Sequence, residues 1–157
     1  MKQELHASFR RLTRNFPELM ERIRRDTFPQ GYPRAKIPEK GVYAFREGAV
    51  TWYVGRSDTI PRRFGQHTHL GSPQNQASFA YLLARDEAEA AGMQVRGLTR
   101  KALAEKADFT PYFDRAKARV GRMTRHAVEV RDPTEQALFE IYAALALRSK
   151  YSDFGNH

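Results

Sequence analysis

Two short stretches decide how this chain folds, Gly41-Val42-Tyr43 and Tyr53-Val54-Gly55. Both belong to segments rich in β-branched and aromatic residues, and Glu47-Gly48 lies between them, which is typical of a β-hairpin. Arg63 follows Tyr53 by ten residues, and His67 follows by fourteen. Two phenols, a guanidinium and an imidazole therefore fall within 25 residues, which is a plausible way to gather polar chemistry on one small surface.

The hairpin loop decides whether the two phenols share a face of the sheet. A two-residue loop at Glu47-Gly48 would pair Tyr43 with Trp52 and would put Tyr43 and Tyr53 on opposite faces. A three-residue loop with Gly48 in the left-handed conformation would put both on one face. We predict the three-residue loop.

A short helix is expected after the hairpin. Asp58 or Thr59 can cap its N-terminus, and Pro61 suits its first turn. Arg63 and His67 are four residues apart, so they would lie on one side of this helix. Aromatic residues in a hairpin are most often core, and an arginine and a histidine on a helix are most often solvated, so it is the joint spacing that points to a site.

The C-terminal helix carries a candidate carboxylate. Asp132 and Glu135 form a capping box around Pro133, and an apolar stripe at helical spacing follows through residue 147. Glu135 has a structural task in the cap. Glu140 lies inside the apolar run with no obvious local partner, so it is the better candidate to bind a hard cation, although it could instead point to solvent beside the stripe.

The rest of the chain reads mostly as helix. We expect helices over 77–91, from Thr99, and from Thr110 with Pro111, and a third strand over 123–130 beside the hairpin. The sequence therefore predicts an α+β fold with a small, mainly antiparallel three-stranded sheet flanked by helices. It predicts a single domain over 1–157, with a basic helical N-terminal extension over 1–36 and a helical insert over 71–121.

The N-terminal extension has an apolar seam, which Pro17 should divide into two short helices or a kinked one. Packing of this seam onto its own domain and docking of a partner helix are both open. The seam consists of Leu5, Phe9, Leu12, Phe16, Leu19 and Ile23.

Composition and charge limit the function. The 157 residues include no cysteine, the N-terminus lacks the apolar run of a signal peptide, and no stretch approaches a membrane span, so we expect a cytoplasmic protein that does not bind membranes. The net charge is +9, of which residues 1–36 carry +5 and residues 94–131 carry +6. Such basic blocks favour nucleic-acid phosphates, although each could be only a solvated face.

These residues suit phosphodiester cleavage. That reaction needs an activated water, a cation on the phosphoryl oxygens and usually a metal at the leaving oxygen. Arginine grips two phosphate oxygens with its planar fork, whereas tyrosine, with a pKa of about 10, needs a neighbouring cation to act as a base.

The pattern resembles the GIY-YIG nuclease superfamily over about residues 40–70 and 122–156. The resemblance implies that Tyr43 orients or deprotonates the attacking water with Tyr53 in support, and that Arg63 holds the scissile phosphate. It also implies that His67 is a phosphate ligand or proton carrier, and that Glu140 binds Mg²⁺ or Mn²⁺, which stabilises the leaving 3′ oxygen. Further contacts to nucleic acid are expected from Arg56, Arg62, Arg115, Lys117 and Arg119.

One position departs from the family pattern. Members usually have asparagine directly after a tyrosine near the end of the module, whereas here Ser152 follows Tyr151. Asn156 could supply the missing amide, or the position could be vacant.

We therefore expect a metal-dependent DNA endonuclease, with RNA left open as a substrate. The alternatives are a non-catalytic nucleic-acid-binding module on the same fold and a helix-mediated protein-interaction subunit. A protein partner or an oligomer is also left open.

Overall fold

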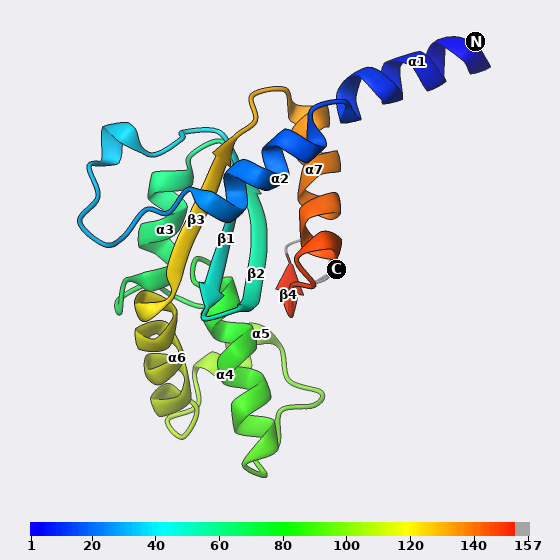
Figure 1. Cartoon of the computed structure of the whole chain (residues 1–157). Coiled ribbons are helices and arrows are strands. Elements are labelled where there is room, and N and C mark those ends of the chain that lie inside the picture. The colour runs from blue at the N-terminus through cyan, green and yellow to red at the C-terminus, as the bar shows by residue number, and fades with distance from the viewer. Residues whose placement is uncertain (153–157) are drawn as a thin grey trace. The chain divides into compact units, whose positions relative to one another are not determined.

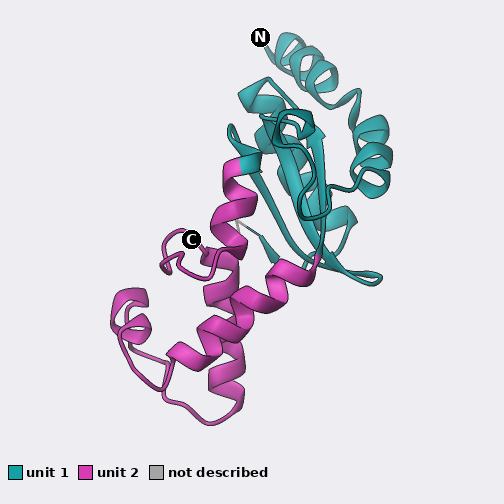
Figure 2. Ribbon diagram, turned by 90° about the vertical axis from the view of Figure 1, so that its left-hand side faces the viewer, with its two compact units in different colours: residues 1–61, 124–157 teal, residues 62–123 magenta. Residues whose placement is uncertain are grey.

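The computed structural model describes residues 1–152, and these form two compact units. Unit 1 combines the N-terminal segment through Pro61 with the segment from Thr124 onward, and unit 2 is the continuous segment Arg62–Met123 between them (Figure 2). The predicted helical insert over 71–121 falls within unit 2.

Unit 1 contains a sheet and the helices that cover one of its faces (Figure 1). The chain passes through two helices and a 3₁₀ turn before it enters the β-hairpin, and it returns after unit 2 with a strand, a long helix and a two-residue strand. In chain order these are α1 (Lys2–Thr13), α2 (Phe16–Arg25), η1 (Arg34–Lys36), β1 (Gly41–Glu47), β2 (Val50–Ser57), β3 (Thr124–Glu129), α7 (Pro133–Ala146) and β4 (Tyr151–Ser152).

The sheet has four strands in the order β3-β1-β2-β4. The predicted α+β class is confirmed, and so is the third strand beside the hairpin, since β3 pairs antiparallel with β1. The prediction of a three-stranded sheet was incomplete, because β4 adds a parallel pair to β2 and makes the sheet mixed. Lys150 N donates to Thr51 O just before β4, so the short strand is held by a backbone bond at its entry.

The two phenols of the hairpin share a face of the sheet as predicted, but the loop differs from the predicted one. Its loop has two residues, Gly48 and Ala49, because Glu47 pairs with Val50. With an uninterrupted ladder this loop would put Tyr53 on the face opposite Tyr43. A β-bulge at Trp52 shifts the register by one residue, so the predicted three-residue loop was wrong while the shared face of the phenols was right.

The core of unit 1 lies between the sheet and two helices. Phe16 and Ile23 of α2 and Phe139 of α7 pack against Val42 and Val54 of the hairpin, and all five are buried. The rings of Phe16 and Phe139 meet edge to face with centroids 5.2 Å apart. The side of the sheet that carries Val42 and Val54 is thus covered by α2 and α7 (Figure 1).

Local signals set several helix ends as expected. Asp132 Oδ1 accepts from the backbone N–H groups of Thr134 and Glu135 at 2.9 and 2.8 Å, which confirms the cap of α7. The N-terminal seam is divided into two helices, and Pro17 lies in the first turn of α2, where its missing N–H costs no hydrogen bond.

Unit 2 is helical. The helix α3 (Ile60–Thr68) begins in unit 1, and unit 2 contains the rest of it together with α4 (Ser78–Ala90), α5 (Arg100–Ala104) and α6 (Thr110–Arg122). Thr99 caps α5 by accepting from Ala102 N at 3.1 Å, as predicted. The helix α6 instead has Phe109 at its N-cap, and the side chain of this residue makes no capping hydrogen bond. Buried aromatic rings fill the unit, including Phe109, which stacks on Phe113 with centroids 6.2 Å apart.

None of the helices in residues 1–152 is long and apolar enough to cross a membrane.

Candidate functional site

The two predicted phenols lie side by side in unit 1. The ring centroids of Tyr43 and Tyr53 are 6.1 Å apart, with a tilt of 36° between the planes. Tyr43 lies directly across from Gly55, which has no side chain on that face, and so the ring can contact Tyr53 on the diagonal. Both side chains are 0 % exposed, so these phenols belong to the interior.

Glu140 is held on the other side of the sheet. It is 4 % exposed on α7, and its Oε2 accepts from Arg56 Nε at 3.0 Å. Arg56 pairs with Val42 in the ladder, so it shares the face that α7 covers, whereas Tyr43 projects from the opposite face. The alternative that Glu140 points to solvent does not hold, and Arg56, predicted to contact nucleic acid, is paired with a carboxylate.

The surroundings of Glu140 show whether it could bind the predicted divalent ion. Magnesium is usually bound through one or two carboxylates, with water and substrate phosphates completing the shell. Glu140 offers an oxygen donor of the right charge, while Arg56 binds at Oε2. In the described part of the chain no three His, Cys, Asp or Glu residues cluster as a metal site. Glu140 thus fits such an ion as its single protein carboxylate, in competition with Arg56.

Arg63 and His67 make a second polar group, in unit 2. Arg63 Nη2 lies 3.2 Å from His67 Nε2, and Arg63 Nη1 donates to Gln66 Oε1 at 2.7 Å and to Gln76 O at 3.3 Å. The predicted i, i+4 pairing on α3 is therefore confirmed. These contacts come from α3 itself and from the loop that precedes α4, so they fix the direction of the half-buried Arg63 guanidinium.

The charge state of His67 follows from its surroundings. The imidazole is fully buried and packs edge-on against Phe79, with centroids 6.5 Å apart. Burial, and secondarily the Arg63 charge, lower the pKa of His67 well below its usual 6.5. The ring is therefore neutral at neutral pH, with Nε2 as an acceptor for Arg63, which makes His67 a positioning residue for Arg63 more readily than a proton carrier.

The basic residues predicted to contact nucleic acid differ in their solvent exposure. Arg62 and Arg115 are exposed, and Arg115 also lies over the Tyr112 ring, with Cζ 4.8 Å from the centroid. Arg119 is half-buried and pairs with Glu87 at 3.1 Å.

Lys117 does not fit the predicted role, because it is 4 % exposed. Its Nζ donates to the backbone oxygens of Leu70 and Ser72 and lies 4.2 Å from the centroid of the Phe113 ring. Lys117 therefore anchors the polar loop after α3. Helical spacing signals this, since residue 117 shares a face with Phe113 and Val120, whereas Arg115 and Arg119 lie elsewhere on α6.

Of the C-terminal residues predicted to support the site, Ser152 lies in the edge strand β4. It lies opposite Val54, and Tyr151 lies opposite Tyr53. Asn156 lies outside the described residues, so its predicted support of the site stays a prediction.

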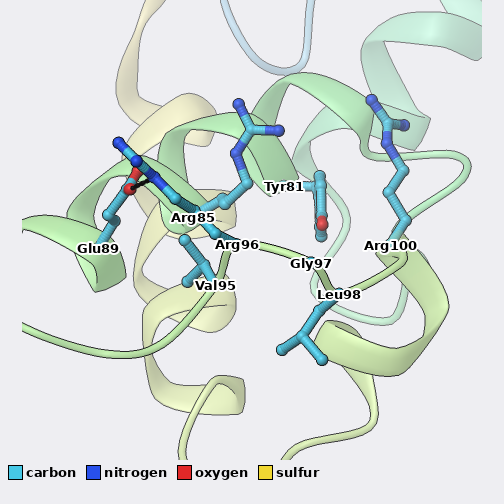
Figure 3. A pocket seen from close by; sticks show the side chains of 8 residues that line it. All are labelled: Tyr81, Arg85, Glu89, Val95, Arg96, Gly97, Leu98 and Arg100. Carbon is cyan, nitrogen blue, oxygen red and sulfur yellow. Dashed lines mark hydrogen bonds and ion pairs between the residues drawn. The ribbon is translucent and has the colours of Figure 1, made fainter.

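The structure also shows two surfaces outside the predicted catalytic residues. One is a groove of about 520 Å³ between α1, α2 and α7, next to which Phe9 and Leu145 are 53 % and 70 % exposed. The suggestion that the N-terminal seam docks a partner helix stays a prediction. The other is a pocket in unit 2 that contains Arg85, Arg96 and Arg100 (Figure 3).

No protein-family model matches the chain, and no curated protein or solved structure is significantly similar to it.

Proposed function

We propose that the protein is a metal-dependent endonuclease of the GIY-YIG type that hydrolyses phosphodiester bonds in DNA. The observation that carries this proposal is the fixed guanidinium of Arg63, which two bonds from its own helix and one from the adjacent loop hold in place. A pre-oriented cation stabilises charge that grows on phosphoryl oxygens without reorganising during the reaction. Because its partner His67 is neutral, Arg63 keeps its full charge for a phosphate.

The remaining roles are assigned to residues of unit 1. Tyr43 and Tyr53 contact each other in the interior and project from the sheet face opposite Glu140. In this proposal the pair therefore has a structural role beside the site and does not contact the attacking water. Glu140 holds the divalent ion, which when bound supplies positive charge at the leaving oxygen. The protein is basic, with a net charge of +9, which favours association with a polyanion.

The decisive experiment is a supercoiled-plasmid assay with Mg²⁺ or Mn²⁺. The proposal requires nicking that depends on the metal and that Arg63→Ala removes while plasmid binding remains. Arg62→Ala is the matched control, because residue 62 is the exposed neighbour on the same helix. Nicking that survives Arg63→Ala would remove the residue on which the proposal depends.

A second candidate function is a nucleic-acid-binding module that does not cleave. Two observations favour it: both phenols are fully buried, and Glu140 is already paired with Arg56. Ser152 in place of the usual asparagine points the same way. If salt-sensitive DNA binding occurs without cleavage under either metal, this second function becomes the better description.

A further inference from the structure

Unit 2 contains a small pocket between α4 and the segment that leads into α5. Its volume is about 320 Å³. Tyr81, Arg85 and Glu89 line it from α4, and Arg96 and Arg100 line it from the other side (Figure 3). The lining thus holds three guanidinium groups and one carboxylate, so its charge favours an anion.

A tight turn fixes the second wall of the pocket. Leu98 N donates to Val95 O at 3.4 Å, and Gly97 has a φ of +80°, a conformation that glycine adopts without strain. Thr99 then caps α5. These hydrogen bonds hold the backbone on both sides of the turn. The Cα positions of Arg96 and Arg100 are therefore fixed relative to the pocket.

The three arginines differ in how far their charge is compensated. Arg96 Nε contacts Glu89 Oε1 at 3.1 Å, and its side chain is 89 % exposed, so this ion pair lies at the rim. Arg85 lies 3.5 Å from its chain neighbour Asp86, and both side chains are more than two-fifths exposed, which makes a weak pair. Within residues 1–152 no carboxylate forms an ion pair with Arg100.

Tyr81 supplies the centre of the pocket. The residue is 2 % exposed, and Arg100 lies over its ring, with Cζ 4.9 Å from the centroid. In Figure 3 the Arg85 and Arg100 guanidinium groups extend in the same direction on either side of this ring. Burial raises the pKa of the Tyr81 hydroxyl, and the charges of Arg85 and Arg100 oppose that rise without cancelling it. The hydroxyl therefore keeps its proton, and in Figure 3 its oxygen lies at the end of the ring away from the two guanidinium groups.

We propose that this pocket binds a phosphate group of a nucleic-acid strand, with Arg85 and Arg100 as its two charged donors. Planar guanidinium forks match phosphate oxygens, and paired forks give strong, directional bonds. Arg100 lies over one face of the Tyr81 ring, and the residue is 2 % exposed, so no ring face is open for a base to stack on. The pocket therefore recognises the phosphate and not the base. This inference concerns binding alone and stands whether or not the protein cleaves its ligand.

The test is a titration of the full chain with inorganic phosphate at constant ionic strength, followed through the Nε–H signals of the arginine side chains in NMR spectra. The Arg85 and Arg100 signals should shift and saturate. Arg100→Gln should weaken binding by about tenfold, and Arg100→Lys, which keeps the charge but loses the fork, should recover only part of that loss. Lys101→Gln is the matched control, since it removes one charge from the exposed neighbouring position and should change affinity by less than about twofold.

Two oligonucleotides of one sequence, with and without a 5′ phosphate, identify the source of the phosphate. If both bind alike and Arg100→Gln weakens both, the ligand is an internal diester; if only the phosphorylated strand responds to Arg100→Gln, the ligand is a terminal monoester.

Several outcomes would overturn the proposal. These are no saturable shift of the Arg85 and Arg100 signals in the wild-type protein, or an equal loss of affinity in Lys101→Gln and Arg100→Gln, which would show diffuse attraction. Because the spectra of the wild-type chain are read directly, the test remains decisive even if a variant fails to fold.

Discussion

Arg56 on β2 and Arg63 on α3 lie seven residues apart in the chain, and they donate to side chains of different charge. Arg56 Nε binds the carboxylate of Glu140 at 3.0 Å. Arg63 Nη2 contacts the neutral imidazole of His67 at 3.2 Å. Both bonds orient a guanidinium, but only the first one neutralises it.

This difference separates two tasks. A carboxylate partner ties α7 to the hairpin and lowers the attraction of Arg56 for other anions. A buried, neutral histidine gives Arg63 direction without removing its charge, which is what a phosphate-binding group requires. The same comparison makes Glu140 the contested residue, because a divalent ion and Arg56 would both bind its carboxylate.

The largest effect is expected at Glu140. Glu140→Gln keeps the shape of the side chain but removes the charge that would hold the ion, so plasmid nicking should fall by about a thousandfold or more. DNA retention should be unchanged, and the half-exposed Arg56 can be solvated, so the protein should still fold by circular dichroism. Nicking that survives in this variant would move the metal to another carboxylate, with Glu135 the next to substitute.

A loss of about a hundredfold in nicking is expected for Arg63→Ala, since one transition-state contact disappears. Affinity for DNA should change by less than about threefold, because many basic side chains share the binding. Nicking rates and filter-retention curves for Arg63→Ala and Arg62→Ala give both quantities. If Arg63→Ala instead lost binding and kept its cleavage rate at saturating DNA, Arg63 would be only one of the general contacts.

The competition at Glu140 can be measured without any cleavage. Arg56→Gln should tighten Mn²⁺ binding by about tenfold, because the guanidinium no longer opposes the ion at the carboxylate. Isothermal titration with Mn²⁺ reports the change. Arg131→Gln is a suitable control, as residue 131 pairs with the exposed Glu129. Unchanged Mn²⁺ affinity in Arg56→Gln would show that the ion, if it binds, does not use Glu140.

His67 should make stability depend on pH. Its pKa in the folded chain lies below the value of 6.5 expected when it is unfolded. Below that pH the unfolded chain takes up a proton that the folded chain does not, so the free energy of unfolding falls on acidification by up to about 1.4 kcal/mol per pH unit. Urea unfolding between about pH 7.5 and about pH 5 should therefore be less pH-dependent in His67→Gln than in the wild type.

His126 also has a pKa lowered by burial, so it adds to the dependence in the same direction, and only the difference between variants isolates His67. The exposed His6 provides the control His6→Gln. Equal pH dependence in His67→Gln and the wild type would mean that His67 is not buried as a neutral group.

The smallest effects are expected on α6. Arg115→Gln should weaken DNA binding by less than about threefold and reduce the magnitude of the salt slope by about one. Lys117→Gln should instead leave the salt slope unchanged and increase hydrogen exchange in the loop over 69–76, because the loop loses its bonds to Nζ. A reversed result would place the Lys117 ammonium at the protein surface.

Short-range rules were sufficient for many elements. The Asp132 cap, the Thr99 cap, the break between α1 and α2 near Pro17 and the helix that carries both Arg63 and His67 all depend on neighbours within about four residues, so the local sequence contains the needed information. The β-branched and aromatic residues on either side of Glu47-Gly48 identified the hairpin strands for the same reason.

The sequence by itself therefore determined the α+β class, the hairpin, the caps at Thr99 and Asp132 and the pairing of Arg63 with His67. Only the tertiary structure decided the bulge at Trp52, the strand β4, the burial of Lys117, the Arg56–Glu140 pair and the arginine pocket. The physical reason is the separation along the chain between the residues that interact. Caps and helical faces form between residues a few positions apart, whereas the partner of a charged side chain comes from an element that can be distant in sequence, as Arg56 and Glu140 are by 84 positions.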